Sequence, residues 1–134
     1  MRHSTSRWTK RCRPTSECSC WARTSPTLAP PARPRAVDEI RPDRVLDTPI
    51  SEAAIVGAAI GAAIDGLLPV AEIMIMDFIG LAADQLINNA AKLRFMTGGR
   101  TAAPITVRTQ VYGGLATGAT HSQSLEAWFM HVPG

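Results

Sequence analysis

A long apolar run over residues 53–83 is the feature that most constrains how this chain can fold. Three acidic residues and a proline interrupt the run, at Asp65, Pro69, Glu72 and Asp77. A membrane-spanning helix needs about twenty consecutive apolar residues, and these interruptions prevent such a stretch from accumulating. The run therefore predicts a helix and a strand that are buried inside a folded domain, with no membrane segment.

The residues before this run predict where the helix begins. Pro49 favours an extended approach, Ser51 is a residue type that caps helices, and Glu52 falls in the first turn. Gly66 is suited to end the helix. Glu52 is the leading functional candidate, although a carboxylate at this position can also serve only to complement the helix dipole.

The rest of the chain alternates between strand and helix patterns. The predicted elements are a strand at 70–76, a helix at 78–96, a strand at 104–107, a Gly-rich loop at 110–120 and a helix at 122–131. This order predicts an α/β fold with a mainly parallel sheet flanked by helices. Functional loops are expected at the carboxyl ends of the strands, and His121 follows such a loop. His121 can equally be a surface histidine, Phe78 can be plain core, and Trp128 and Phe129 are expected in a core or an interface.

Several familiar catalytic motifs are missing. The Gly-rich loop at 113–118 lacks the lysine of a phosphate-binding P-loop and the spacing of a dinucleotide fingerprint. We find no Ser-His-Asp arrangement, no glycosidase pair of carboxylates and no His/Cys cluster for a transition metal. The residues alone therefore indicate an α/β domain with two suggestive polar residues, Glu52 and His121.

The first 37 residues differ sharply from the others. They hold eight Lys and Arg against one Glu, all three cysteines and five of the ten prolines, whereas residues 38–134 hold six basic and ten acidic residues. The segment has no basic stripe of a nucleic-acid-binding fold, and Cys12, Cys18 and Cys20 lack the paired spacing of a metal site. It can be an organellar transit peptide, which is typically rich in Arg and Ser and poor in acids.

A shifted reading frame explains the same segment better. Because Trp has a single codon, the shifted frame must read Asp at Trp8, Leu at Cys20 and Gly at Trp21. With G or C at open third positions, residues 8–24 then read as an acidic helix end followed by ADERVFVLGED, which includes a buried strand. Residues 1–37 are accordingly expected to be disordered or frameshifted, with residues 38–134 forming the domain.

Five short sequences carry a resemblance to a known family. They are RVLDTPISE at 44–52, AEIM at 71–74, DQLINNAAK at 84–92, MTGG at 96–99 and HSQSLEAWFMHVPG at 121–134. In this order they resemble the β subunit of thiamine-diphosphate-dependent 2-oxo acid dehydrogenases, the decarboxylating component of pyruvate, branched-chain and acetoin dehydrogenase complexes. The shifted reading that ends in LGED resembles the segment that precedes them. The resemblance implies a thiamine-diphosphate-binding, transketolase-like pyrimidine-binding domain that is incomplete on its C-terminal side. Another thiamine enzyme, such as a transketolase, matches these motifs less well.

The resemblance also implies roles for individual residues. Glu52 resembles the glutamate that hydrogen-bonds N1′ of the aminopyrimidine ring of thiamine diphosphate, and Phe78 resembles an aromatic that packs on that ring. His121 resembles the active-site histidine that assists decarboxylation and acyl transfer to lipoamide. Ile105 stands where family members can offer a backbone carbonyl to a structural potassium ion.

The implied partners follow from a missing motif. The Gly-Asp-Gly sequence that holds magnesium and the diphosphate is absent here, and in this family it belongs to the α subunit. The resemblance thus implies a heterotetramer of two α and two β subunits that acts on a 2-oxo acid or acetoin, with a lipoyl acyltransferase as the next partner and no nucleic acid. We expect an oxidoreductase component that is inactive by itself, located in a bacterial cytoplasm, or in the mitochondrial matrix if the start is a transit peptide. The alternative is a noncatalytic truncated fragment or an interaction-only subunit.

Overall fold

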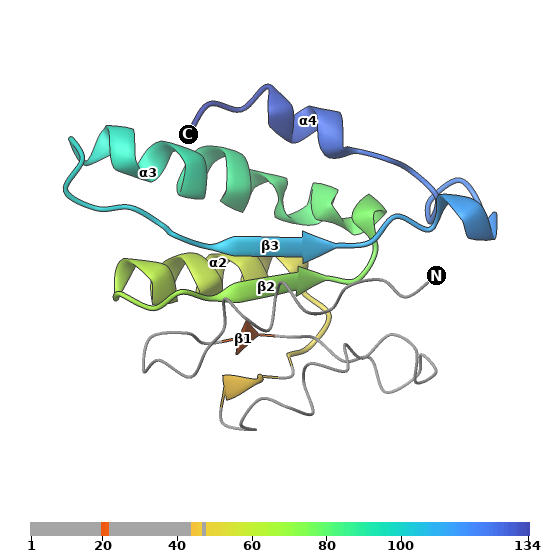
Figure 1. Ribbon diagram of the computed structural model, residues 1–134, viewed down its shortest axis with the longest axis horizontal. Helices are drawn as coiled ribbons and strands as arrows, with labels where there is room; N and C mark the ends of the chain where they lie inside the picture. The colour runs from red at the N-terminus through yellow and green to blue at the C-terminus, as the bar shows by residue number, and fades with distance from the viewer. Residues whose placement is uncertain (1–19, 22–43, 47) are drawn as a thin grey trace, which may run out of the picture.

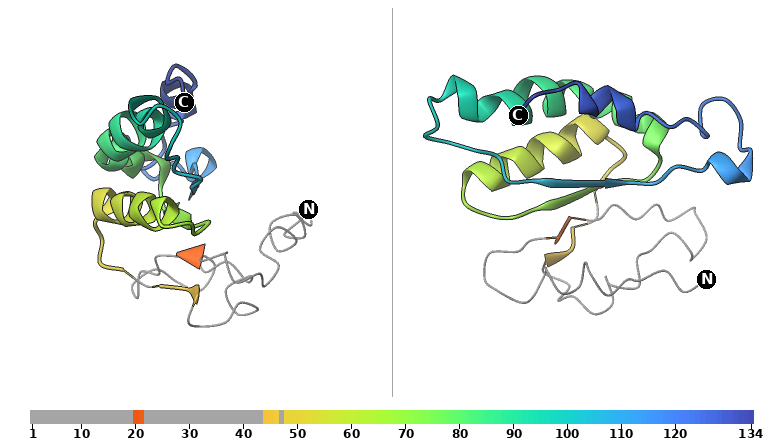
Figure 2. Two further views of the ribbon diagram at one scale, coloured as in Figure 1. Left: turned by 90° about the vertical axis from the view of Figure 1, so that its left-hand side faces the viewer. Right: turned by 45° about the horizontal axis from the view of Figure 1, so that its top comes forward.

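A small parallel sheet organises the molecule. The computed structural model describes residues 20–21, 44–46 and 48–134. Its three strands are β1 (Cys20–Trp21), β2 (Val70–Ile73) and β3 (Thr106–Thr109), and they pair in the order β1-β2-β3 with every pair parallel (Figure 1). Helix α2 and the helical segment that ends in α3 lie beside one another, and α2 packs on β2 (Figures 1 and 2). The predicted α/β fold with a parallel sheet is confirmed.

Helix α2 (Glu52–Ile64) begins one residue after the predicted start. Ser51 takes the cap position, where its backbone carbonyl accepts the Ile55 N–H at 2.9 Å, but its side chain makes no capping hydrogen bond. The expected serine side-chain cap is therefore wrong, and the backbone alone starts the helix. Gly66 ends it as predicted: its φ of +94° favours glycine, and the chain turns away from the helix there.

The predicted helix at 78–96 forms a continuous helical segment that combines three kinds of helix. The 3₁₀ helix η4 (Met76–Ala82) leads to the π-helix η5 (Gln85–Ala90) and then to α3 (Ala91–Met96). In the π-helical part, the Asn88 and Asn89 side-chain amides donate to the Asp84 carboxylate at 2.8 and 3.5 Å. Side-chain bonds of this local kind compete with the regular backbone pattern, which sequence periodicity does not reveal.

The remaining elements differ in length or position from the predictions. β2 ends at Ile73 rather than at residue 76, because the chain bends at residues 74 and 75 before η4 begins. β3 is shifted by two residues from the predicted 104–107. The predicted loop contains the short 3₁₀ helix η6 (Gly113–Leu115), and α4 covers Glu126–Met130. Among the described residues, no helix is long and apolar enough to cross a membrane.

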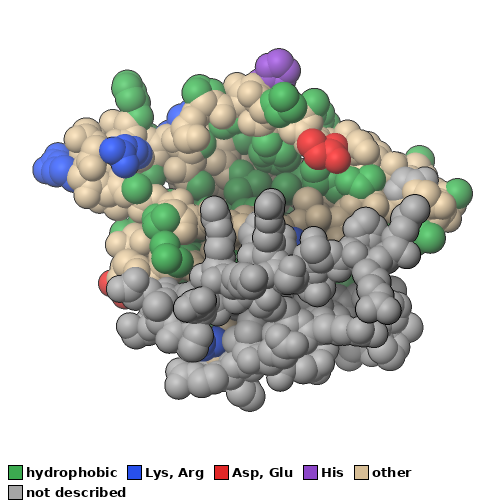
Figure 3. Space-filling view, viewed as in Figure 1, with side chains coloured by type: hydrophobic (Ala, Val, Ile, Leu, Met, Phe, Trp, Pro, Cys, Tyr) green, Lys and Arg blue, Asp and Glu red, His purple; other side chains and the backbone are tan. Residues whose placement is uncertain are grey.

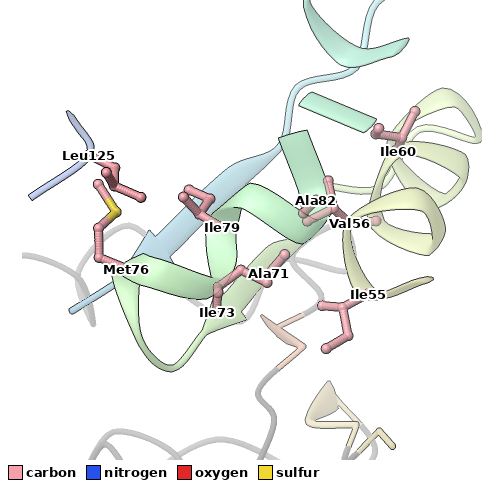
Figure 4. Close-up of a cluster of buried hydrophobic side chains, with 10 residues drawn as sticks. Ile55, Val56, Ile60, Ala71, Ile73, Met76, Ile79, Ala82 and Leu125 are labelled. Carbon is pink, nitrogen blue, oxygen red and sulfur yellow. The ribbon is translucent and has the colours of Figure 1, made fainter. Parts of the chain in front are cut away.

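The hydrophobic core lies between α2, β2 and η4. Buried side chains from these elements pack against one another in Figure 4, where α2 contributes Ile55, Val56 and Ile60 and β2 contributes Ala71 and Ile73. Near the end of the chain, Leu125 is buried in this cluster and the half-buried Phe129 of α4 packs against it, whereas Trp128 is 55% exposed. Trp128 is therefore not part of the core of this chain. Figure 3 shows many hydrophobic side chains at the surface of the face viewed in Figure 1.

Strand β1 was not predicted. Cys20 pairs with Val70 and Trp21 pairs with Ala71, so this two-residue strand extends the sheet beyond β2. It coincides with the last residues of the strand in the shifted reading of residues 8–24. Apart from β1, the predictions for residues 1–37 lie outside the described residues.

Candidate functional site

Glu52 is placed at the carboxyl edge of the sheet. It is the first residue of α2, and only 5% of its surface is exposed. The helix runs antiparallel to the strands, so its N-terminus lies at the end of the sheet towards which β2 and β3 point (Figure 1). Backbone N–H groups at a helix N-terminus favour a negative charge. A buried carboxylate is thus held at the edge where parallel sheets bind ligands.

Phe78 and His121 meet at the same edge. Phe78 follows β2 within η4, and His121 follows the Gly-rich loop after β3. Their rings are in edge-to-face contact, with centroids 5.3 Å apart and an angle of 82° between the planes. The Thr120 hydroxyl lies 3.1 Å from Nδ1 of His121. The structure therefore brings together two of the residues that sequence reasoning had singled out separately.

Asp77 and Gln123 form a second link between these segments, which sequence reasoning missed. The Gln123 side-chain amide donates to the Asp77 carboxylate at 2.7 Å, and the Gln123 backbone N–H donates to the two carboxylate oxygens at 3.3 and 3.4 Å. Each partner stands next to, or two residues from, a predicted site residue. That proximity in sequence was the available signal, but only the fold shows that the two segments touch.

Glu72 and Arg108 form a partly buried ion pair across β2 and β3, in which the glutamate is buried and the arginine is partly exposed. They are directly opposite in the strand register, and an Arg108 guanidinium nitrogen donates to the Glu72 carboxylate. Burial raises the pKa of Glu72, and this effect outweighs the opposing effects of Arg108 and of a hydrogen bond from Gln110. A single carboxylate inside an apolar strand was the sequence signal for this pair.

The Glu72 pair gives a pH-dependent prediction. Because the folded chain holds the Glu72 proton more tightly than the unfolded chain, this group favours folding below the unfolded pKa of about 4.3. That contribution to folding is lost as the pH rises through the raised pKa of Glu72 in the folded chain. In Glu72→Gln this pH-dependent loss of stability no longer occurs, because glutamine does not titrate. The Arg108 guanidinium, without its partner, can be hydrated because 40% of its side chain is exposed. The stability of the variant relative to the parent should therefore increase from about pH 4 to about pH 7.

Urea unfolding of both proteins across this pH range measures the difference in unfolding free energy between Glu72→Gln and the parent. Glu126→Gln changes an exposed glutamate in the same way and serves as the control. A constant difference between Glu72→Gln and the parent across the range would contradict the prediction.

Ile105 lies apart from the other predicted residues. It stands immediately before β3, at the amino end of that strand, and its backbone N–H donates to the Ala103 carbonyl at 2.8 Å. Glu52, Phe78 and His121 are at the opposite, carboxyl edge. Within the described part of the chain, no group of three or more His, Cys, Asp and Glu side chains could hold a metal ion.

The structure also has a groove, which lies away from the carboxyl edge of the sheet. It runs between α3 and the last residues of the chain, with a volume of about 820 Å³ and a largely apolar lining. Lys92 and Arg94 are its charged lining residues, and the Lys92 ammonium donates to the Pro133 carbonyl at 2.9 Å. The residues that line the groove include no Asp or Glu and none of the predicted site residues. We therefore place the candidate site at the carboxyl edge of the sheet.

Comparisons with known proteins identify the family of this chain. A family model described as "Transketolase, pyrimidine binding domain" matches residues 1–134. The chain is 54% identical over 98 residues to the β subunit of acetoin:2,6-dichlorophenolindophenol oxidoreductase from Bacillus subtilis, covering 73% of this chain and 29% of the relative.

Relatives whose names contain other substrates have similar sequence identities to this chain. The chain is 47% identical over 98 residues to the mitochondrial pyruvate dehydrogenase E1 component subunit beta-2 of Oryza sativa, covering 73% of this chain and 26% of the relative. It is 50% identical over 91 residues to the 2-oxoisovalerate dehydrogenase subunit beta of Pseudomonas aeruginosa, covering 68% and 26%. The chain spans between a quarter and a third of the length of these relatives. It belongs to the transketolase pyrimidine-binding domain family, with β subunits of 2-oxo acid and acetoin dehydrogenases among its relatives.

Proposed function

We propose that this chain is the pyrimidine-binding part of the β subunit of a 2-oxo acid or acetoin dehydrogenase. In that role it takes part in thiamine-diphosphate-dependent oxidative decarboxylation of a 2-oxo acid, or cleavage of acetoin, with acyl transfer to lipoamide. The observation that carries the proposal is the buried carboxylate of Glu52, which α2 holds at the carboxyl edge of the sheet in a chain of this family.

The residues at this edge fit the aminopyrimidine ring of thiamine diphosphate. A flat heterocycle with ring nitrogens needs an aromatic or apolar surface and a carboxyl group, and Phe78 and Glu52 supply them. The hydroxyls of Thr48 and Thr109 are buried and have no hydrogen-bond partner among the described residues. Thr48 precedes α2 and Thr109 is the last residue of β3, so both belong to this edge. A polar ligand there would offer partners to these groups.

The chemistry assigned to this chain concerns proton positions. Thiamine diphosphate, when bound, supplies the carbon nucleophile and the electron sink for decarboxylation. Glu52 would hold a proton at N1′ of the aminopyrimidine ring, and burial keeps water from competing for that carboxyl group. His121 would hold or deliver a proton at the reacting oxygen and at the lipoamide thiol. Phe78 would orient the ring and, through its contact with His121, the imidazole as well.

The proposed assembly supplies what this chain lacks. An α subunit would hold magnesium and the diphosphate, two α and two β subunits would form a heterotetramer, and a lipoyl acyltransferase would receive the acyl group. The Ile105 carbonyl is proposed as a potassium ligand away from the catalytic edge. The names of the relatives point to acetoin, pyruvate or 2-oxoisovalerate as substrates. We propose a bacterial cytoplasmic location, with the mitochondrial matrix as the alternative.

A noncatalytic role is the second candidate. Apolar side chains on and near α3 and α4 are exposed, including Phe95 at 88%, Met96 at 65% and Met130 at 83%. Exposed apolar surface of this kind is typical of a protein interface. A chain that only packs against a partner would use this surface without using Glu52.

A chimera separates the two candidates. The segment of the Bacillus subtilis acetoin dehydrogenase β subunit that matches this chain is replaced by the corresponding residues of this chain, and the product is combined with the matching α subunit. We expect thiamine-diphosphate-dependent activity with acetoin or a 2-oxo acid. A chimera that assembles with the α subunit but shows no such activity with any of the three substrates would favour the noncatalytic role.

A further inference from the structure

We propose that Asp77 is a positioning residue that fastens the segment 121–123 to the end of β2 and thereby holds His121 against Phe78. The Asp77 carboxylate accepts hydrogen bonds from both the side-chain amide and the backbone N–H of Gln123, at 2.7 to 3.4 Å. We call this set of hydrogen bonds the Asp77 latch. Gln123 lies in the motif at 121–134, but the motif alone does not show the latch, because the latch depends on the contact between two distant segments.

The latch and the aromatic contact join the same two segments. Asp77 and Phe78 are neighbours at the start of η4, and His121 and Gln123 are two residues apart after the Gly-rich loop. The polar contact fixes the backbone of the second segment, because one of its donors is the Gln123 backbone N–H. Fixing that backbone leaves the His121 side chain facing the Phe78 ring. The bond from the Gln123 side-chain amide, at 2.7 Å, is made to a carboxylate and is therefore of the stronger, charge-assisted kind, and the set lies at the surface of the molecule.

The loop before His121 depends on such a tie. Residues 114–120 are exposed, and Ala116 and Gly118 have φ values of +48° and +104°. The Thr117 hydroxyl donates to the His121 carbonyl at 3.0 Å, a bond that stabilises the loop internally but does not join it to the sheet. Where the loop leaves β3, the Met76 N–H donates to the Gln110 carbonyl at 2.8 Å and ties that end of the loop to the chain after β2. The Asp77 latch provides the corresponding tie at the far end.

The consequence for catalysis rests on the proposed function, whereas the latch itself does not. If His121 handles a proton in the reaction, a small displacement of its ring costs a large factor in rate, because proton transfer demands close alignment. Loss of the latch should then lower kcat more than it raises KM.

Exchanging the Asp77 carboxylate and the Gln123 side-chain amide tests the latch. Gln123→Glu places two carboxylates against each other and removes the side-chain donor, so it should release segment 121–123. Asp77→Asn combined with Gln123→Glu restores one amide and one carboxylate, and the asparagine oxygen can still accept the backbone N–H. Ser124→Glu adds the same charge at the next, exposed position and is the matched control.

The readout is the rate at which diethyl pyrocarbonate modifies His121, measured by peptide mass spectrometry on the full 134-residue chain. Exposed His131 is the internal reference. Gln123→Glu should raise the His121 rate by about tenfold, the factor expected when charge-assisted hydrogen bonds are lost, and the double variant should restore it. An unchanged His121 rate in Gln123→Glu, an equal rise in Ser124→Glu, or no restoration in the double variant would overturn the proposal.

Asp77→Ala covers the case in which Gln123→Glu unfolds, which loss of circular dichroism would reveal. It removes the acceptor of all three hydrogen bonds, so a rise in the His121 rate with an unchanged His131 rate supports the latch and no rise overturns it. Activity in the chimera is recorded separately. If the proposed function is wrong, activity is absent in every variant, but the His121 rate still reports on the latch.

Discussion

Glu52→Gln should reduce thiamine-diphosphate-dependent turnover in the chimera with the α subunit by about 10²- to 10⁴-fold, the range that general acid–base groups contribute. The reason is that glutamine keeps the size of the side chain, but its amide cannot give a proton to N1′ of the aminopyrimidine ring or take one back as a carboxyl group can. The fold should be retained, because Glu52 is the first residue of α2 and glutamine is a good helix former. Steady-state decarboxylation and thiamine diphosphate binding are measured on the same preparations.

Glu126→Gln is the matched control for this prediction. It makes the same chemical change at an exposed glutamate in the first turn of α4 and should leave turnover within about twofold, as most exposed substitutions do. Equal turnover in Glu52→Gln and Glu126→Gln would remove Glu52 from the catalytic machinery. Its burial would then be explained by the helix terminus alone.

Ile73→Ala should lower the free energy of unfolding by about 2–5 kcal/mol, the usual cost of removing a buried isoleucine side chain. Ile73 is 1% exposed and lies on β2 within the core cluster, so truncation would leave a cavity between the sheet and α2 (Figure 4). Urea unfolding of the full chain, followed by circular dichroism, measures the change.

Ile64→Ala deletes the same atoms at a position that is 49% exposed, in the last turn of α2. Its cost should stay below about 1 kcal/mol, since less apolar surface leaves water there on folding. Similar losses in the two variants would mean that the sheet and α2 do not form the core of this chain in solution.

Local patterns predicted the elements well where the interactions are local. The start of α2 at Glu52 and its end at Gly66 follow from a few neighbouring residues, and the structure places both within a residue or two. The same patterns left open what distant residues decide. Trp128 was expected in a core or an interface, and the structure places it outside the core of this chain, with 55% of its surface exposed. The serine side-chain cap of α2 failed because the Ser51 backbone already satisfies the first turn.

The candidate site divides in the same way. Glu52 and His121 could be singled out from the sequence, because each stands in a short motif whose residue types carry chemistry, and Phe78 could be singled out through the family resemblance. The Asp77 latch could not, because its two partners are far apart in sequence and meet only after the carboxyl ends of β2 and β3 come together.

By itself, the sequence determined the α/β character of the chain, the position of Glu52 at the start of a helix and the family resemblance, because these depend on residue type and spacing along the chain. The tertiary structure decided which residues share the carboxyl edge of the sheet. It also decided that Glu72 is buried with Arg108 as its partner, and that Ile105 lies at the other end. Contacts across strands depend on register and on the packing of whole elements, and local spacing does not specify either.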